Sequence, residues 1–319
     1  MLDLIKARSV AGSRPGHREE DAKLALVIEG GGMRGVVSGG MVTALDELGL
    51  QNAFDFVVGT SAGALAGAFF LAGQTHMGTS IYYEDLIGRE WLDYRRALRR
   101  TPIVALDYLL DEVMVNRKVL DCGRVLASET PLYVVATRVP EYEPVILGDF
   151  ETRAKLMTAL RASARIPLAA GKPVTFDGGE YIDGSLSQSI PLEAAQRLGA
   201  THMLVLLTRP RGKVRGYPGN LQRRVVFPVM NKLQVGLGDA YALRAERYAC
   251  ELEKLEALQA KSAGGGALAI QLPPDAELVR QLEQNPRVLH SGAVAGAAAA
   301  FRLLTGEEYE VFGEFAESG

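Results

Sequence analysis

A serine flanked by glycines is the first residue whose type and setting could support catalysis. Residues 59–63 read GTSAG, which places Ser61 at the centre of a G-x-S-x-G pattern. This pattern is typical of the sharp strand-to-helix turn that exposes a nucleophilic hydroxyl, with the serine amide at a helix N-terminus. A chain with 35 glycines can contain the pattern by chance. An apolar strand-like segment before the turn and an apolar helical segment after it favour the nucleophile.

A second glycine-rich segment, residues 30–35 (GGGMRG), follows the apolar run at residues 24–28. Glycine permits positive φ and a close approach of the backbone to a ligand, and amides at a helix N-terminus attract negative charge. Such a loop can hold an oxyanion, a phosphate or a dinucleotide. A dinucleotide site needs an acidic residue at the end of the next strand. Because Asp55 begins that strand instead, we reject the dinucleotide interpretation.

Two aspartates compete for the role of the base that a serine nucleophile needs. Asp177 opens the sequence DGG, and Asp183 opens the sequence DGS six residues later. Residues 177–180 (DGGE) join two short strand-like segments and are typical of a hairpin turn. We therefore expect Asp177 to lie in the turn and Asp183 to project into the site from the end of the second strand. Taken alone, the Asp183 segment also fits an ordinary turn.

The elements that must position these residues alternate between strand-like and helical segments. Residues 24–28 and 54–58 are short apolar runs, and residues 34–48 and 61–71 have helical spacing. This order predicts an α/β fold with a mainly parallel central sheet. Further strands are expected at residues 132–137, 145–147, 174–176, 181–182 and 202–207.

Glycines near the C-terminus indicate how the chain divides. Residues 263–266 (AGGG) form the best linker candidate, since glycine-rich stretches punctuate structure. We therefore expect an N-terminal extension at residues 1–22, a catalytic domain at residues 23–262 and a small C-terminal appendage at residues 263–319 that packs on the core.

The glycine-rich loop, the serine turn and the aspartate together resemble the patatin-like phospholipase family. That family combines a G-G-G-x-[R/K]-G loop, a G-x-S-x-G turn and a D-G-[G/A] motif, and the order and approximate spacing match here from about residue 23 to residue 208. The resemblance implies a three-layer α/β/α domain and a lipid acyl-hydrolase in which Ser61 is the nucleophile and Asp183 its partner in a dyad. Around the oxyanion hole, it implies Gly30, Gly31, Gly32 and Arg34.

Two further segments bear on this resemblance. Residues 161–167 (RASARIP) are similar to the A-S-x-A-x-P segment that precedes the aspartate in the family. The aspartate motif departs from the family pattern, because Ser185 stands where glycine or alanine is usual. This departure concerns the local backbone and leaves the carboxylate in place. An apolar acyl pocket, also implied, is compatible with a set of residues that equally suit an ordinary core: Met33, Val36, Leu65, Phe69 and Phe70.

Two alternative functions and one alternative mechanism remain open. The functions are a general carboxylesterase for soluble esters and a non-catalytic lipid-binding module of the same fold. The mechanism is a Ser-His-Asp triad, for which His290 is the one credible partner among His17, His76, His202 and His290. A dyad needs neither a metal nor an organic cofactor, so we expect none.

Bulk properties limit the partners and the location. The net charge of −3 gives no electrostatic reason to expect nucleic acid. Cys122 and Cys250 suggest no disulfide framework, and the N-terminus has no apolar signal region, so we expect a cytoplasmic protein. Its expected partner is a lipid or other acyl-ester substrate, met at a membrane surface by peripheral contact. The oligomeric state is left open. Arginines suited to anionic headgroups, or to a solvated helix face, are Arg95, Arg96, Arg99 and Arg100.

Overall fold

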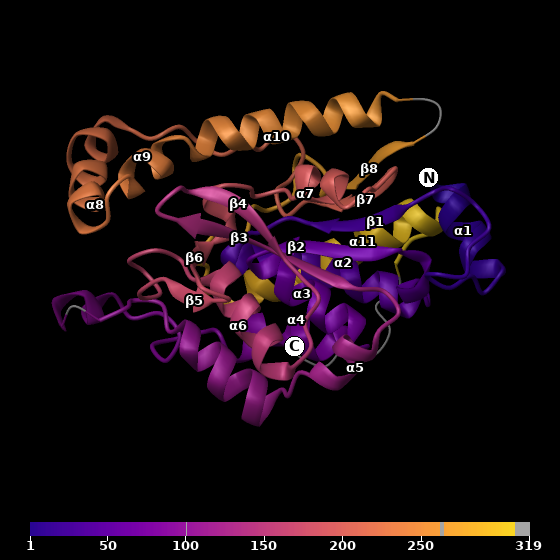
Figure 1. The fold of residues 1–319 in the computed structure, drawn as a ribbon, viewed down its shortest axis with the longest axis horizontal. Coiled ribbons are helices and arrows are strands. Elements are labelled where there is room, and N and C mark those ends of the chain that lie inside the picture. The colour runs from indigo at the N-terminus through magenta and orange to yellow at the C-terminus, as the bar shows by residue number, and fades with distance from the viewer. Residues whose placement is uncertain (100, 262–264, 310–319) are drawn as a thin grey trace.

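The computed structural model describes residues 1–99, 101–261 and 265–309 (Figure 1). A central sheet is covered by helices on both faces, as a three-layer α/β/α architecture requires. The strands are β1 (Leu24–Ile28), β2 (Phe56–Thr60), β3 (Leu132–Val139), β4 (Glu143–Leu147), β5 (Val174–Phe176), β6 (Gly179–Asp183), β7 (His202–Leu206) and β8 (Gly266–Ile270). The predicted fold class, α/β with a mainly parallel sheet, is confirmed.

The strand order is β5-β6-β3-β2-β1-β7-β8, and β4 also pairs with β3. Strands β3, β2, β1, β7 and β8 form a continuous parallel block, whereas β4, β5 and β6 are joined by antiparallel pairing. The block reads as apolar runs because both of its faces are buried. Within β1, for example, every residue is fully buried.

The helices are α1 (Leu2–Val10), α2 (Gly35–Glu47), α3 (Ala62–Leu71), α4 (Thr75–Glu84), α5 (Cys122–Ala127), α6 (Arg153–Ala164), α7 (Leu192–Arg197), α8 (Phe227–Leu233), α9 (Leu237–Ala242), α10 (Arg244–Gln259) and α11 (Pro286–Thr305). Two π-helical segments occur at Tyr108–Arg117 and Gln222–Val226, and 3-10 turns at Gly32–Arg34, Gln51–Ala53, Tyr94–Arg99 and Gly184–Leu186. In Figure 1, α10 and α7 lie above the sheet, and α2, α3 and α4 lie below it.

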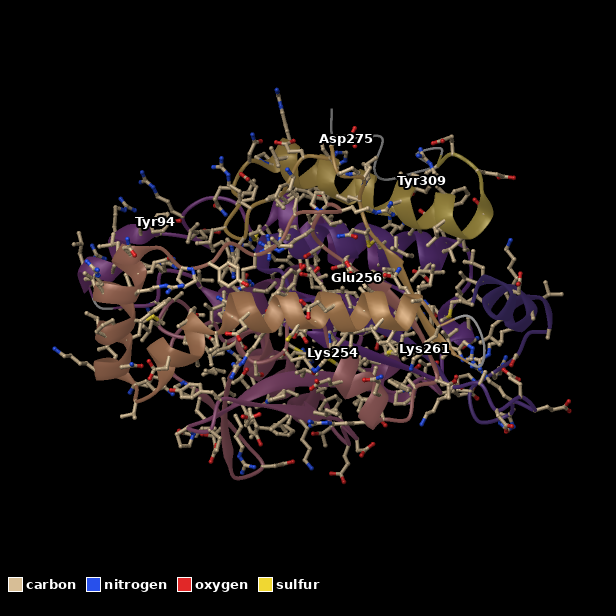
Figure 2. All side chains as sticks on the ribbon, turned by 90° about the horizontal axis from the view of Figure 1, so that it is seen from above. Tyr94, Lys254, Glu256, Lys261, Asp275 and Tyr309 are labelled. Atoms are coloured by element: carbon tan, nitrogen blue, oxygen red, sulfur yellow. The ribbon has the colours of Figure 1, made fainter. Side chains whose placement is uncertain are left out.

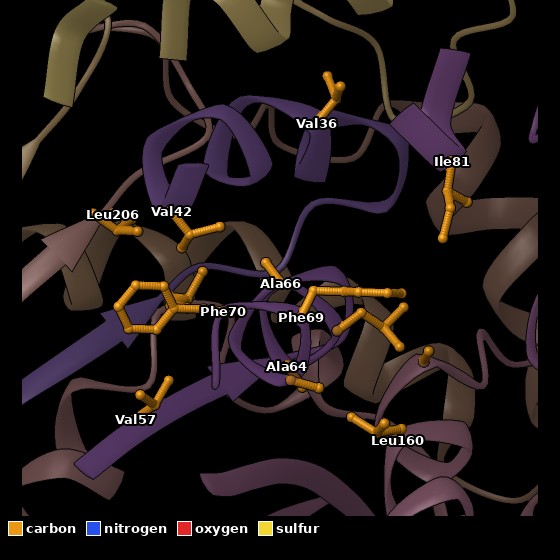
Figure 3. Packing of buried hydrophobic residues seen from close by; sticks show 14 of the residues in the cluster. Val36, Val42, Val57, Ala64, Ala66, Phe69, Phe70, Ile81, Leu160 and Leu206 are labelled. Atoms are coloured by element: carbon orange, nitrogen blue, oxygen red, sulfur yellow. The ribbon is translucent and has the colours of Figure 1, made fainter. Parts of the chain in front are cut away.

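Two hydrophobic cores fill the spaces between the layers. Side chains of β1 alternate between them: Leu24, Leu26 and Ile28 join the larger core below the sheet, and Ala25 and Val27 join the core under α10. Alternation is the expected consequence of the period of two along a strand. Figure 3 shows part of the larger core around α3, with Phe69, Phe70 and Ala66 packed among residues of α2, α4 and α6.

The C-terminal region does not stand apart from the rest of the molecule. Strand β8 extends the sheet in parallel beside β7, and α11 packs along α2. A Cβ atom on Gly40 would lie 1.9 Å from the Ala293 carbonyl oxygen, so the two helices approach closely only because glycine is there. Of the expected appendage at residues 263–319, the described part therefore belongs to the main layers. Residues 263–264 of the expected linker lie outside the described residues.

Among the described residues, helix α11 is long and apolar enough, by length and composition alone, to cross a membrane. Its apolar side packs against α2, where Leu289, Ala293 and Ala297 are fully buried.

The N-terminal extension is also attached to the main layers: Arg8 in α1 binds the Asp55 carboxylate at 2.9 Å. Asp55 thus lies at the start of β2, far along the strand from the glycine-rich loop.

Candidate active site

The turn between β2 and α3 holds Ser61 in a strained backbone conformation. Its φ is +54° and its ψ is −122°, a sparsely populated region for a residue with a side chain, which costs on the order of 1–3 kcal/mol. The Ser61 amide donates to the Ser163 hydroxyl oxygen at 2.7 Å, and the Ser163 hydroxyl donates to the Val135 carbonyl at 2.6 Å. Helix α6 therefore holds the turn in place through one buried serine.

Glycines make this turn sterically possible. A Cβ atom on Gly63 would lie 2.4 Å from the Ile28 carbonyl oxygen, so α3 can begin directly against the end of β1 only with glycine at that position. A Cβ atom on Gly30 would lie 3.3 Å from the Ser61 Cβ and 2.5 Å from the Ser185 hydroxyl oxygen. The glycine-rich loop and the serine turn consequently share one crowded site.

Sheet register brings the second predicted residue to this site. Along β3, Val135 pairs with Thr60 of β2, and the next residue, Ala136, pairs with Asp183 of β6. Ser61, which follows Thr60, thus lies beside Asp183 although 122 positions separate them in the chain. The Ser61 hydroxyl donates to Asp183 Oδ2 at 2.9 Å.

The Asp183 carboxylate is held and tuned by its surroundings. Its Oδ1 accepts the Ser185 amide at 2.7 Å, so both carboxylate oxygens have partners. Burial raises the pKa of Asp183 above its ordinary value, while the Ser185 amide and the Arg244 charge act in the opposite direction. A buried carboxylate with a raised pKa is a stronger base than an exposed one once it is ionised. Ser185 contributes through its backbone, which the family's glycine or alanine could also do.

The backbone amides of the glycine-rich loop differ in whether they already have an acceptor. The Gly30 amide donates to the Ser189 carbonyl at 3.0 Å, and the Arg34 amide donates to the Gly31 carbonyl at 3.3 Å, so neither amide is directed to a ligand. Among the described residues, the Gly31 and Gly32 amides have no acceptor. Of the expected set, the amides of these two residues are therefore the ones that can donate to a ligand.

Residues from the C-terminal region hold this loop, which the sequence did not suggest. The Met33 amide donates to the Gln281 carbonyl at 3.1 Å, and Gly32 has φ +59°. A Cβ atom on Gly32 would lie 2.8 Å from the same Gln281 oxygen. The conformation that frees the Gly32 amide thus depends on a contact made across most of the chain.

A patatin-like phospholipase family model matches residues 26–195, just over half of the chain. The chain belongs to the patatin-like phospholipase family. Members of this family are lipid acyl-hydrolases, and the matched range includes the glycine-rich loop, the serine turn and Asp183.

Individual relatives of this patatin-like chain cover parts of longer proteins. The uncharacterized protein YjjU of Escherichia coli (strain K12) is 31% identical over 195 residues, which are 60% of this chain and 53% of YjjU. The patatin-like phospholipase domain-containing protein 7 of mouse is 25% identical over 201 residues, 57% of this chain and 13% of that protein. The chain thus spans about half the length of YjjU and a small part of the mouse relative.

Solved structures give more distant likenesses. VipD from Legionella pneumophila has a TM-score of 0.48 at 14% identity, over 90% of this chain and 67% of that one. The human GIVD cytosolic phospholipase A2 has a TM-score of 0.37 at 14% identity, over 72% of this chain and 46% of that one.

An apolar pocket opens beside the patatin-like serine. Its lining includes Ser61, Met33, Leu65, Trp91 and Ile166. A second apolar pocket lies beyond it and is lined by Phe69 among others. The two cavities share the side chains Leu65, Tyr82, Leu86 and Leu109. Of the five residues named for an acyl pocket, Met33, Leu65 and Phe69 line these cavities, whereas Val36 and Phe70 are buried in the core.

Arg34 of the loop belongs to a cluster of arginines that also includes Arg209, Arg215 and Arg244. Burial and the charge of Arg209 lower the pKa of Arg34 to about 10, and burial with the charges of Arg244 and Arg209 lowers the pKa of Arg215 to about 9. Glu29, which accepts the Thr208 amide and hydroxyl, is the acidic residue that favours their charged forms. The Arg34 side chain therefore belongs to a basic cluster next to the Gly31 and Gly32 amides, whereas its own backbone amide donates to the Gly31 carbonyl.

The contacts shown for three of the histidines are to residues other than Ser61 and Asp183. His76 bonds to Glu47, His202 bonds to Thr201, and the His290 ring packs edge-on against Tyr83, while Asp183 accepts directly from Ser61. In the described part of the chain, no group of three or more His, Cys, Asp or Glu side chains could hold a metal ion.

Proposed function

We propose that this chain is a serine lipid acyl-hydrolase that cleaves fatty-acyl esters of phospholipids or lysophospholipids through a Ser61–Asp183 dyad. The observation that carries the proposal is the 2.9 Å hydrogen bond from the Ser61 hydroxyl to Asp183, beside an apolar cavity. A serine hydroxyl is a weak nucleophile at neutral pH and needs a base within this distance.

Acylation begins when the Ser61 oxygen attacks the ester carbonyl carbon and Asp183 accepts the hydroxyl proton. The carbonyl oxygen becomes an oxyanion, which the Gly31 and Gly32 amides stabilise; loss of one such donor typically lowers the rate about 100- to 1000-fold. Collapse of the tetrahedral intermediate breaks the ester bond. The leaving alcohol takes the proton from Asp183, and the fatty acyl group remains on Ser61.

Deacylation repeats these steps with water as the nucleophile. Asp183 accepts a proton from the water as its oxygen attacks the acyl-enzyme carbonyl, and the Gly31 and Gly32 amides again stabilise the oxyanion. The Ser61 oxygen leaves and recovers the proton, which releases the fatty acid. Every proton is returned, so the dyad is ready for another cycle.

The cavity favours a lipid over a small soluble ester. Its lining is apolar, with Leu65, Trp91 and Ile166 among the side chains next to Ser61, and burying each methylene of an acyl chain there contributes about 0.8 kcal/mol. We therefore expect kcat/KM for nitrophenyl esters to rise from butyrate to longer chains. A preference for the shortest chain would favour the general carboxylesterase.

A fluorophosphonate probe tests whether Ser61 reacts at all. We expect the wild-type chain to be labelled and Ser61→Ala not to be. An unlabelled wild-type chain that binds fatty acid would instead support the lipid-binding module. Labelling of both chains would mean that another residue is the nucleophile.

A further inference from the structure

One segment of the chain is strongly basic in an otherwise acidic protein. Residues 209–238 contain seven arginines and lysines and no aspartate or glutamate. Since the whole chain has a net charge of −3, the remaining residues together carry a net charge of −10. We call residues 209–238 the basic arm. Its basic residues are Arg209, Arg211, Lys213, Arg215, Arg223, Arg224 and Lys232.

The basic arm also exposes large apolar side chains. Eight of them are between 41% and 83% exposed, which is more than half of all such residues in the described part of the chain. Clusters of this kind on a soluble protein mark interaction surfaces. The eight are Val214, Tyr217, Leu221, Val225, Val226, Val229, Leu233 and Val235.

The arm is anchored to the body, so its exposed side is a surface of a folded element. Phe227, Met230 and Leu237 are buried in a small core with Ile182 and Leu186. The Tyr142 hydroxyl also donates to the Val235 carbonyl at 2.8 Å. One side of the arm therefore packs on the hairpin that carries Asp183, and the other side, with its valines and leucines, faces outward.

The arm lies at the end of the molecule that holds the site. In Figure 1, α8 and α9 project at the left end of the molecule, opposite α1 and the N-terminus. Helix α10 follows directly, and its Arg244 donates to the Ser185 carbonyl at 3.4 Å, next to Asp183. In Figure 2, Tyr94 lies at this same end, on a 3-10 turn that also exposes Leu98 and carries Arg95. Arg100 of the basic group noted in the sequence lies outside the described residues.

We propose that the basic arm docks on an anionic lipid bilayer, with its exposed valines and leucines among the acyl chains and its exposed arginines and lysines, Arg209 and Arg215 excepted, on the headgroups. Exposed apolar area and positive charge together strengthen binding to the interface of an anionic bilayer. An anionic surface repels the acidic remainder of the chain, so the molecule is oriented with the arm and the site toward the lipid. The inference that docking brings the site to its substrate rests on the proposed function. Vesicle binding itself can be measured without any assay of hydrolysis.

Co-sedimentation of the full chain with vesicles tests the proposal. We expect binding to phosphatidylcholine vesicles that contain phosphatidylglycerol, weak binding without it, and a loss of binding as salt rises. Arg223→Glu/Arg224→Glu removes two attractive charges and adds two repulsive ones, which is expected to weaken the partition at least about tenfold. Leu233→Ser/Val235→Ser is expected to weaken it at the same ionic strength without changing the salt dependence.

Lys6→Glu/Arg14→Glu is the matched control, because it makes the same charge change on exposed residues at the N-terminal end. Circular dichroism and a melting curve establish that each variant is folded. Equal weakening by the control and by Arg223→Glu/Arg224→Glu would overturn the arm as the docking surface, and so would unchanged binding of both arm variants. If the chain dimerises through Leu233 and Val235 and does not bind vesicles, the arm is a contact between copies instead.

Hydrolysis of nitrophenyl butyrate in solution separates this inference from the proposed function. We expect both arm variants to retain wild-type turnover of this soluble ester and to lose turnover of vesicle lipid. Vesicle binding by a chain that hydrolyses no ester would refute the proposed function and leave the docking surface standing.

Discussion

Asp177 and Asp183 stand at opposite ends of strand β6, and glycine follows each of them. Asp177 lies in the turn between β5 and β6 with φ +41°, and Gly178 beside it has nothing within 4 Å of a built Cβ atom. Asp183 is buried, accepts from Ser61 and Ser185, and has a raised pKa. The two Asp-Gly pairs therefore differ in chemistry because the register along β3 places only Asp183 level with the end of β2, where Ser61 lies.

The largest expected effect is the difference in kcat/KM between variants of these two aspartates. Asp183→Asn removes the base and is expected to lower kcat/KM by about 10²- to 10⁴-fold, whereas Asp177→Asn leaves it within about twofold. Steady-state hydrolysis of a nitrophenyl ester measures both. The reverse pattern would mean that the turn aspartate is the catalytic one.

The glycines that follow the two aspartates, Gly184 and Gly178, are expected to differ in how much the folded state depends on them. A Cβ atom on Gly184 would lie 2.2 Å from the Val135 carbonyl oxygen, so Gly184→Ala must displace β3 or β6 and is expected to destabilise by more than about 3 kcal/mol. Gly178 has φ +78° in open space, so Gly178→Ala is expected to cost only about 1–2 kcal/mol. Urea unfolding gives both free energies, and equal losses would contradict the close approach at Gly184.

Ser163→Ala tests the positioning of Ser61 on the catalytic side of the comparison. It leaves the buried Ser61 amide without an acceptor, which costs about 1–3 kcal/mol, and the nucleophile turn becomes less fixed. We expect kcat to fall about tenfold with KM nearly unchanged. Ser189→Ala is the control, because that buried hydroxyl bonds to the Ser185 carbonyl and not to Ser61. A fall in stability with no fall in kcat would make Ser163 purely structural.

The smallest effect concerns pH. Because the pKa of Asp183 is raised, the acid limb of kcat/KM should lie above the ordinary aspartate value of 3.8. The folded state holds this proton more tightly than the unfolded state, so the contribution of Asp183 to stability falls as pH rises from 3.8 through the raised pKa. Subtracting the Asp183→Asn stability from that of the wild type at each pH isolates this fall from that of Glu251, whose pKa burial raises to about 8. A difference that grows with pH would contradict the sign.

Much of the site could be predicted because it depends on neighbouring residues. The apolar runs, the glycines of residues 30–35 and 59–63, and Ser61 between a strand and a helix all follow from steric rules that act within a few positions. The hairpin turn at Asp177 is of the same kind. These features indicated the α/β fold and the family.

Only the tertiary structure decided which groups have partners. The Gly30 amide donates to the Ser189 carbonyl, the Ser61 amide to the Ser163 hydroxyl and the Met33 amide to the Gln281 carbonyl. Each hydrogen bond joins residues far apart in the chain. Residues beyond 265 join the sheet and the α2 face because β7 and α2 present an unpaired edge and a glycine-lined surface there. Register along β3 sets Ser61 beside Asp183, and burial sets the pKa of that carboxyl. Pairing and desolvation depend on what surrounds a residue in space, and spacing along the chain does not encode that directly.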